Sequence, residues 1–232
     1  MMAEIQTSVE LSQTRWGWLT ILLSVVALVL AGMTIGFELA GAIVGVYFFK
    51  PLTILTILLI AVIALHPPSD RYKWMLIFGL AFSLLGDVIL MLPLDLFIFG
   101  LLAFLAANTF YILAYSSVGG FYKSYKATVP YILYGLILLV YLWPNLGDMV
   151  FPAMIYTLVI LTMSWQALGQ WKQTGERRAF LAFIGSLLFV ASDSALAIGR
   201  FANPIELAPL FVLGTYYPAQ WLISLSAGSD HP

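Results

Sequence analysis

Residues 83–92 read SLLGDVILML and residues 189–201 read FVASDSALAIGRF, and each stretch places one aspartate inside a long apolar run. Asp87 and Asp193 have no other acidic residue and no basic residue within five positions on either side. A charged side chain at the bilayer centre costs about 2.5–3.5 kcal/mol on insertion scales, so such residues usually face a polar cavity and carry a function. Two such stretches predict a paired site on two membrane-spanning helices.

The composition indicates an integral membrane protein. Of the 232 residues, 62% are hydrophobic and 9% are charged, and apolar runs of about 20 residues recur along the chain. A membrane β-barrel would show short segments of alternating hydrophobicity instead. We therefore expect an all-α fold, a polytopic transmembrane helical bundle that forms one domain over residues 1–232.

The apolar runs predict eight spans. They cover residues 17–36, 45–65, 74–92, 95–117, 127–143, 149–170, 179–199 and 205–226. Lys50-Pro51 interrupts the second run, and proline suits the first turn of a helix. That span has an alternative start at Lys50, with residues 37–49 as a re-entrant or interfacial connector. Residues 1–16 carry two glutamates and lack a basic start, so we expect a tail rather than a signal peptide, and residues 227–232 form the second tail.

Basic residues are distributed unevenly between the two sides of this predicted bundle. The N-terminal tail and the connections after spans two, four and six hold eight of the ten Lys and Arg residues, leaving Lys50 and Arg200 on the other side. The positive-inside rule predicts a multi-pass protein of the cell membrane with both termini cytoplasmic. Asp87 and Asp193 then lie on parallel helices, about 7–9 Å below the outer boundary at 1.5 Å per residue.

A weak internal repeat accompanies this arrangement. Gly86-Asp87 and Ser192-Asp193 are 106 residues apart, and the span openings at Pro51 and Pro152 are 101 residues apart. The ends of spans four and eight, FYILAYS and QWLISLS, are 110 residues apart. A four-plus-four parallel duplication would explain these offsets, although apolar helices also resemble one another by composition alone.

Polar side chains near the two aspartates are the candidates for binding. Hydroxyl and amide groups share their helices or the neighbouring spans, and two cations lie toward the outer side. These candidates are Lys50, Ser83, Asn108, Tyr111, Ser192, Ser194, Arg200, Tyr217 and Gln220. A purely structural explanation stays open, because buried carboxyls and amides also join helices and Lys50 could extend to the membrane interface.

Several function classes lack their sequence signals. The net charge of −1 gives no footprint for nucleic acid, and the absence of cysteine removes thiolate chemistry. His66 lies in a predicted loop and His231 in the C-terminal tail, neither placed for a metal site or a Ser-His-Asp triad. We expect no metal and no cofactor.

In these stretches the chain resembles the YhhN family of lysoplasmalogenases, which are integral membrane hydrolases. The matching segments are KPLTIL at 50–55, SLLGDVILML at 83–92, GLLAFLAANTFYILAY at 100–115, FVASDSALAIGRF at 189–201 and YYPAQWLISLS at 216–226. They run in order from the second span to the last. One departure is Asn108, which stands where the family often has His.

The resemblance implies hydrolysis of the vinyl ether bond of lysoplasmalogens to a fatty aldehyde and glycerophosphoethanolamine or glycerophosphocholine. This reaction needs a proton on the β-carbon and passes through an oxocarbenium-like state, as glycoside hydrolysis does. Asp87 and Asp193 are the expected catalytic pair, one protonated as the acid and one ionised to stabilise the cation and activate water. A lysophospholipid substrate, with Lys50 or Arg200 near its phosphate, and surrounding membrane lipids are the expected partners; the oligomeric state is left open.

Other readings stay open. A proton-coupled membrane transporter would also place Asp87 and Asp193 inside the membrane. An intramembrane aspartyl protease also uses paired aspartates, but such proteases carry a glycine two residues before the Gly-Asp pair, and Leu84 stands there. A helical scaffold does not explain two buried acids.

Overall fold

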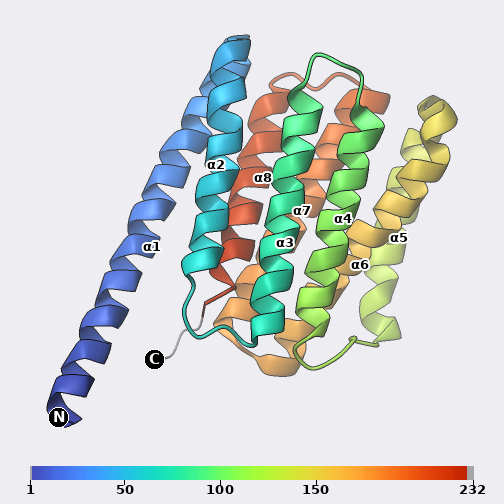
Figure 1. The fold of residues 1–232 in the computed structure, drawn as a ribbon. Coiled ribbons are helices and arrows are strands. Elements are labelled where there is room, and N and C mark those ends of the chain that lie inside the picture. The colour runs from blue at the N-terminus through green and yellow to red at the C-terminus, as the bar shows by residue number, and fades with distance from the viewer. Residues whose placement is uncertain (1, 229–232) are drawn as a thin grey trace.

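The computed structural model describes residues 2–228, with side chains from residue 17 onward, and this part of the chain is all-helical. It contains eight α-helices and one short 3-10 helix (Figure 1). They are α1 (Met2–Leu39), α2 (Ile43–Ile63), α3 (Asp70–Met91), α4 (Phe97–Ser116), α5 (Tyr125–Leu146), η1 (Gly147–Met149), α6 (Val150–Thr174), α7 (Arg177–Phe201) and α8 (Ala208–Leu225). An all-α fold is therefore confirmed for the described residues.

The helix boundaries follow the predicted spans, with two differences. Helix α1 begins at Met2, so helical backbone extends through the predicted N-terminal tail. Helix α2 begins at Ile43 and contains Pro51 in its interior, so the alternative start at Lys50, with a connector over residues 37–49, is wrong. The apolar sequence on both sides of Pro51 continues the helix although proline removes one backbone hydrogen bond. Of the predicted C-terminal tail, residues 229–232 lie outside the described residues.

Local sequence signals explain several helix ends. The Ser69 side chain accepts a hydrogen bond from the Tyr72 backbone N–H at 3.1 Å and caps the start of α3, while Ser124 caps α5 in the same way. Such caps satisfy backbone donors that have no partner within the helix. Gly175 follows α6 with a φ of +68°, a left-handed conformation that glycine adopts without strain.

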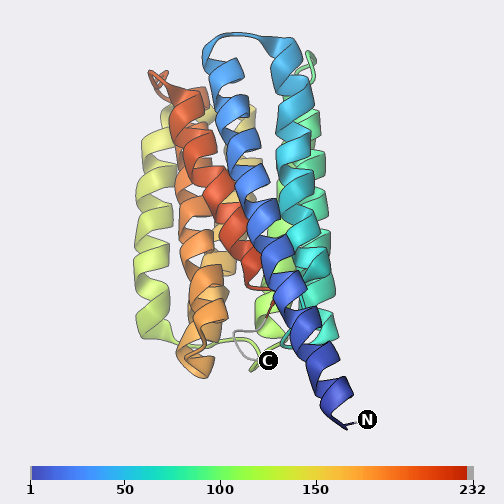
Figure 2. The ribbon, with the colours of Figure 1, turned by 90° about the vertical axis from the view of Figure 1, so that its left-hand side faces the viewer.

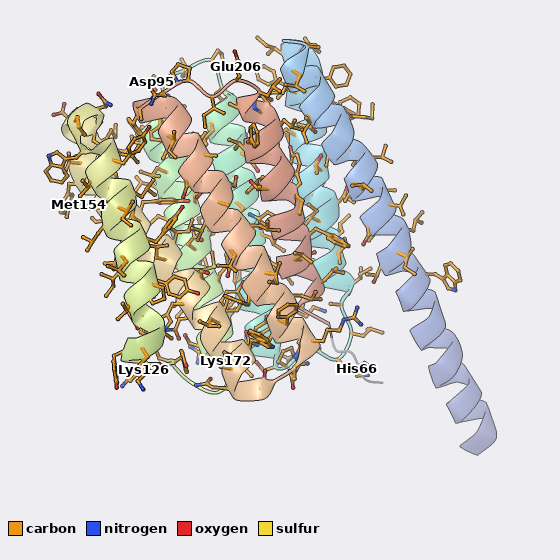
Figure 3. The ribbon with its side chains drawn as sticks, turned by 180° about the vertical axis from the view of Figure 1, so that it is seen from behind. His66, Asp95, Lys126, Met154, Lys172 and Glu206 are labelled. Atoms are coloured by element: carbon orange, nitrogen blue, oxygen red, sulfur yellow. The ribbon has the colours of Figure 1, made fainter. Side chains whose placement is uncertain are left out.

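Successive helices alternate in direction, which separates two ends of the bundle. Figure 3 places Asp95 and Glu206 at one end, and His66, Lys126 and Lys172 at the other. We call these the acidic end and the basic end. Helices α3 and α7 both run from the basic end to the acidic end, so they are parallel, as the sequence predicted (Figures 1 and 3).

Five helices surround the centre of the bundle. Helices α3, α4, α6, α7 and α8 contact one another in that circular order, while α1 and α2 pack along one side and α5 packs against α6 and α7 on the other. Figures 1 and 2 show α1 on one flank, inclined across the remaining helices. Helix α5 is peripheral: Gly135, Leu142 and Leu146 are its only fully buried residues.

Length and composition identify six segments able to cross a membrane among the described residues. One of them covers residues 125–174, which the structure divides into α5 and α6, and α8 is not among the six. The chain is therefore a multi-pass membrane protein. The count of eight spans and the four-plus-four repeat stay predictions.

A cluster of four buried aromatic rings fills the centre of the bundle. Phe104 and Tyr111 come from α4, Phe189 from α7 and Tyr216 from α8. The Phe189 ring lies 6.1 Å from Phe104 and 5.6 Å from Tyr216, both at steep angles. Such edge-to-face pairs contribute about 0.5–1.5 kcal/mol each beyond their burial. Polar side chains that include both aspartates lie next to this aromatic cluster.

Candidate functional site

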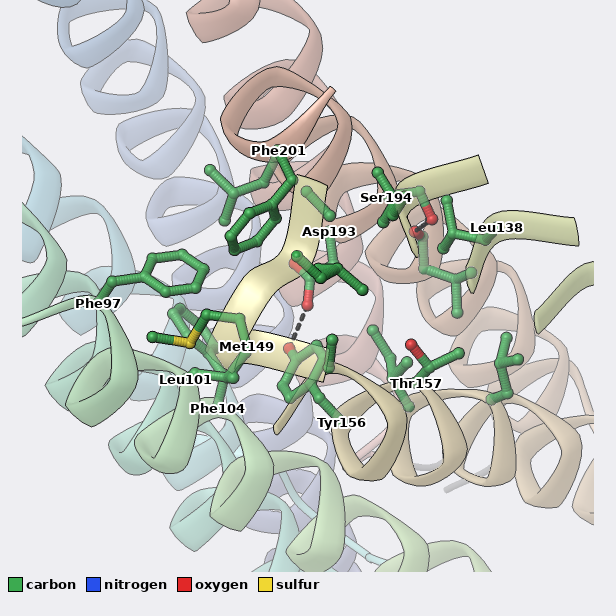
Figure 4. Close-up of a pocket in the computed structure, with 18 of the residues that line it drawn as sticks. Phe97, Leu101, Phe104, Leu138, Met149, Tyr156, Thr157, Asp193, Ser194 and Phe201 are labelled. Atoms are coloured by element: carbon green, nitrogen blue, oxygen red, sulfur yellow. Dashed lines mark hydrogen bonds between the residues drawn. The ribbon is translucent and has the colours of Figure 1, made fainter. Parts of the chain in front are cut away.

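An apolar pocket opens between the acidic-end halves of α4, α5, α6 and α7, and Asp193 lies in its wall (Figure 4). Most of the lining is aliphatic or aromatic. The polar lining residues are Tyr134, Tyr156, Thr157, Asp193 and Ser194. We call this space the inner pocket. Asp193 is its only titratable carboxyl, so the pocket combines one acidic group with room for a hydrocarbon chain.

A hydrogen-bonded chain of three residues orients the Asp193 carboxyl. The Tyr156 hydroxyl of α6 donates to Asp193 Oδ2, as Figure 4 shows. Asn108 of α4 lies behind Tyr156, and its Nδ2 donates to the Tyr156 hydroxyl at 3.4 Å and to the Phe104 carbonyl at 2.9 Å. Because an amide nitrogen only donates, the single Tyr156 proton is directed toward Asp193.

Ser194 also reaches the inner pocket, where it meets α5. Its hydroxyl lies 2.7 Å from the Tyr134 hydroxyl, and it donates to the Val190 carbonyl one turn earlier in α7. This contact ties the peripheral helix α5 to α7 beside the pocket. Asp193 itself forms no ion pair with any described basic side chain.

Asp87 of α3 contacts polar side chains of α2 and α8. Lys50 Nζ is 3.6 Å from Asp87 Oδ1, and the Tyr216 hydroxyl donates to Asp87 Oδ2 at 2.7 Å. The Asp87 side chain is only 4% exposed and that of Lys50 13%. Asp87 is therefore an enclosed, ion-paired carboxylate, and it does not line the inner pocket.

The same aromatic cluster is next to both aspartates. Phe104 lines the inner pocket beside Asp193, and its ring lies 6.0 Å from the Tyr216 ring, whose hydroxyl binds Asp87. A Cβ at Gly86 would lie 2.7 Å from the Phe104 ring, so only glycine there lets α3 and α4 approach this closely. No hydrogen bond joins the two carboxyls among the described contacts.

Three more of the predicted residues form a closed hydrogen-bonded group one turn from Asp87. The Tyr111 hydroxyl donates to Gln220 Oε1 at 2.8 Å, and Gln220 Nε2 donates to Ser83 Oγ at 3.0 Å. Ser83 Oγ is also 3.4 Å from the Tyr111 hydroxyl. All three side chains are fully buried. This group joins α3, α4 and α8, and its members satisfy one another rather than facing the inner pocket.

The remaining predicted residues lie apart from the inner pocket. The Ser192 hydroxyl donates to the Val212 carbonyl at 2.9 Å and joins α7 to α8. Tyr217 lines a groove between α1 and α8. Arg200 lies at the acidic end, where its guanidinium contacts Asp95 at 3.0 Å. Of the residues predicted from the sequence, Asp193 and Ser194 therefore line the inner pocket, and Asn108 lies behind Tyr156.

Two tyrosines of this site were missed by the sequence reasoning. Tyr156 lies within the apolar run FPAMIYTLVIL of α6, and Tyr134 within α5. Aromatic residues in membrane helices are common, so neither tyrosine stands out by composition. The available signal for Tyr156 was its position about two turns inside α6, slightly removed from the interface where tyrosines gather. Among the described residues, no group of three His, Cys, Asp or Glu side chains is placed to hold a metal ion.

Comparison with known proteins adds a family match over most of the chain. The YhhN family matches residues 45–227. A lysoplasmalogenase, TMEM86B, of Sus scrofa is 36% identical over 152 residues, which cover 64% of this chain and 61% of that protein. Lysoplasmalogenase TMEM86B of Homo sapiens is 35% identical over 170 residues, covering 69% of this chain and 66% of that protein.

A bacterial relative carries no activity in its name. The uncharacterized membrane protein YhhN of Escherichia coli O157:H7 is 29% identical over 147 residues, which cover 63% of this chain and 70% of that protein. The chain thus spans slightly less than two thirds of the two mammalian relatives above. No solved structure matches it.

Proposed function

The chain belongs to the YhhN family, and we propose that it is a lysoplasmalogenase, a membrane hydrolase that cleaves the vinyl ether bond of lysoplasmalogens. The observation that carries this proposal is the position of Asp193, a single carboxyl in the wall of an otherwise apolar pocket. A single-chain lipid needs an apolar pocket for its hydrocarbon, and a vinyl ether needs a proton donor beside it. The mammalian relatives named lysoplasmalogenase support the same activity.

In the proposed reaction, Asp193 is the acid. Its proton adds to the β-carbon of the vinyl ether, and the positive charge that develops is shared between the α-carbon and the ether oxygen. Water then adds to the α-carbon and gives a proton to the Asp193 carboxylate, which restores the acid and leaves a hemiacetal. Collapse of the hemiacetal breaks the bond between the α-carbon and the glycerol oxygen. This releases a fatty aldehyde and a glycerophospho-alcohol. Substrate and one water account for every atom of the products.

Tyr156 and Asp87 have different parts in this proposal. Tyr156 holds one carboxyl oxygen of Asp193 and leaves the other for the substrate. Asp87, paired with Lys50, is the ionised partner. Its negative charge favours the cationic state across a low-dielectric interior. The two carboxyls thus divide the work between proton donor and electrostatic stabiliser.

The proposed orientation follows from the charge distribution. Eight spans in the cell membrane, with both termini cytoplasmic, would put the basic end in the cytoplasm. The inner pocket then lies in the outer half of the membrane. Its wall at the peripheral helix α5 would give a lipid lateral access.

Aldehyde release by the purified full-length protein in detergent tests this function. The substrate is lysoplasmenylethanolamine, with the ester lysolipid of the same chain length as control. The expected result is aldehyde from the vinyl ether only. No aldehyde from folded protein across ethanolamine and choline head groups would contradict the hydrolase and favour a proton-coupled membrane transporter, which needs a gradient rather than a bond to cleave.

A further inference from the structure

A second pocket adjoins the inner pocket at the acidic end, and its charges belong to Arg200 and Asp95. It lies between the last turn of α7, the start of α8 and the α3–α4 connection. We call it the rim pocket. Leu90, Phe97 and Leu196 line both pockets, so the two spaces share one wall. The two pockets are therefore immediate neighbours.

The charged groups of the rim pocket contact each other and an aromatic ring. Arg200 contacts Asp95 at 3.0 Å, and its guanidinium carbon lies 4.1 Å from the centre of the Phe97 ring. Phe97 in turn packs edge-on against Phe201 at 5.6 Å, and both rings line the inner pocket. The guanidinium thus lies against the wall that divides the pockets. The pair stays accessible, because the Arg200 side chain is 41% exposed and that of Asp95 84%.

The spacing along α7 relates these charges to the acid. Arg200 follows Asp193 by seven residues, two helical turns on the same side of α7, or about 10 Å along the axis. In a lysoplasmalogen the vinyl ether and the phosphate are separated by a three-carbon glycerol. A substrate with its vinyl ether at Asp193 would direct its head group toward the acidic end and the rim pocket.

We propose that the rim pocket is the head-group site of the substrate, with Arg200 binding the phosphate and Asp95 the ammonium of a zwitterionic lysophospholipid. Arginine suits phosphate because its planar guanidinium offers several donors. Lys50, the alternative for the phosphate, is less accessible, because its side chain is 13% exposed and that of Arg200 is 41% exposed. This inference rests on the proposed function for the identity of the lipid. The inference predicts that the rim pocket prefers head groups that carry both a phosphate and an ammonium.

A structural role for the same pair makes a different prediction. An exposed ion pair contributes little to stability, and a structural contact between α7 and the α3–α4 connection would affect every substrate alike. A head-group site would discriminate between substrates. Three vinyl ether lysolipids of one chain length separate these cases: ethanolamine and choline head groups carry both charges, whereas a phosphoglycerol head group carries the phosphate alone.

The test measures KM and kcat for aldehyde release with these three lipids. Arg200→Gln is expected to raise KM about tenfold for all of them, because each loses a charge-assisted phosphate contact. Asp95→Asn is expected to raise KM about threefold to fivefold for ethanolamine and choline, and not for phosphoglycerol. The matched controls are Glu206→Gln, an exposed acid at the same end, and Arg177→Gln, an exposed arginine at the other end of α7. Both should leave KM unchanged.

Two outcomes overturn the head-group site: an unchanged KM in Arg200→Gln, or an Asp95→Asn effect that is equal for all three lipids. Native mass spectrometry can measure the binding of 1-O-alkyl lysolipids with the same head groups. These lipids lack the vinyl double bond, so they give a readout without turnover. If the wild-type protein releases no aldehyde yet the alkyl lipids show the expected head-group pattern, the hydrolase proposal fails and the rim pocket stands. Aldehyde release without a difference between head groups would support the hydrolase proposal and overturn the head-group site.

Discussion

The surroundings of the two intramembrane aspartates differ in charge and in access. Asp87 has a lysine partner and a tyrosine donor in an enclosed region, whereas Asp193 has a tyrosine donor, no described cation and a pocket beside it. A buried carboxylate with a cation is stabilised in its ionised form, while a carboxyl without one more readily keeps its proton. Two residues that look alike in sequence thus have different surroundings in the structure.

The largest expected effect comes from removing the pocket carboxyl. Asp193→Asn keeps the size of the side chain and its contact with Tyr156 but has no acidic proton, so hydrolysis should fall by about 10³-fold. Aldehyde release per folded protein measures it, with size-exclusion chromatography as the control for folding. Activity within tenfold of the wild type would remove Asp193 from the role of acid.

Asp87→Asn sharpens the comparison, because it acts on both charge and stability. We expect about a 100-fold loss of activity together with a lower melting temperature, since Lys50 is left without its partner. The double variant Lys50→Met/Asp87→Asn removes both charges. It should recover most of the stability and little of the activity. Full recovery of activity in the double variant would make the Lys50–Asp87 pair structural and leave Asp193 to act alone.

Tyr156→Phe tests the orientation of the acid. The variant loses the hydroxyl that donates to Asp193 but keeps the ring, so kcat should fall about tenfold with little change in KM. Tyr134→Phe is the matched control, because its hydroxyl also lines the pocket but contacts Ser194 instead. Equal losses in the two variants would show that pocket polarity matters, rather than the contact with Asp193.

The smallest expected effect concerns the packing that holds α7 against α8. A Cβ at Gly185 would lie 2.8 Å from the Ala219 carbonyl oxygen, which is backbone and cannot move aside. Gly185→Ala should therefore destabilise the protein by about 1–3 kcal/mol. Gly214→Ala in α8, where no atom lies within 4 Å of the new methyl group, is the control. Unfolding in mixed micelles measures both, and indistinguishable curves would contradict close packing at Gly185.

Sequence reasoning reached the helices and both aspartates because these depend on local patterns. Apolar runs define spans, and a carboxyl within one is conspicuous. Sequence reasoning did not predict which side chains contact one another. Asn108 was expected at the substrate but lies behind Tyr156, and Ser83, Tyr111 and Gln220 bind one another. Such pairings depend on how each helix rotates about its axis, which packing between distant segments determines.

The sequence by itself determined that this chain is a bundle of apolar helices with two carboxyls inside and most positive charge at one end. These properties belong to single residues and to their distances along the chain. Only the tertiary structure decided which carboxyl faces a pocket and which one is paired with lysine. The reason is that α2 brings Lys50 to Asp87 while α6 brings Tyr156 to Asp193. Such partners come from separate helices, so they meet only when the helices pack against one another.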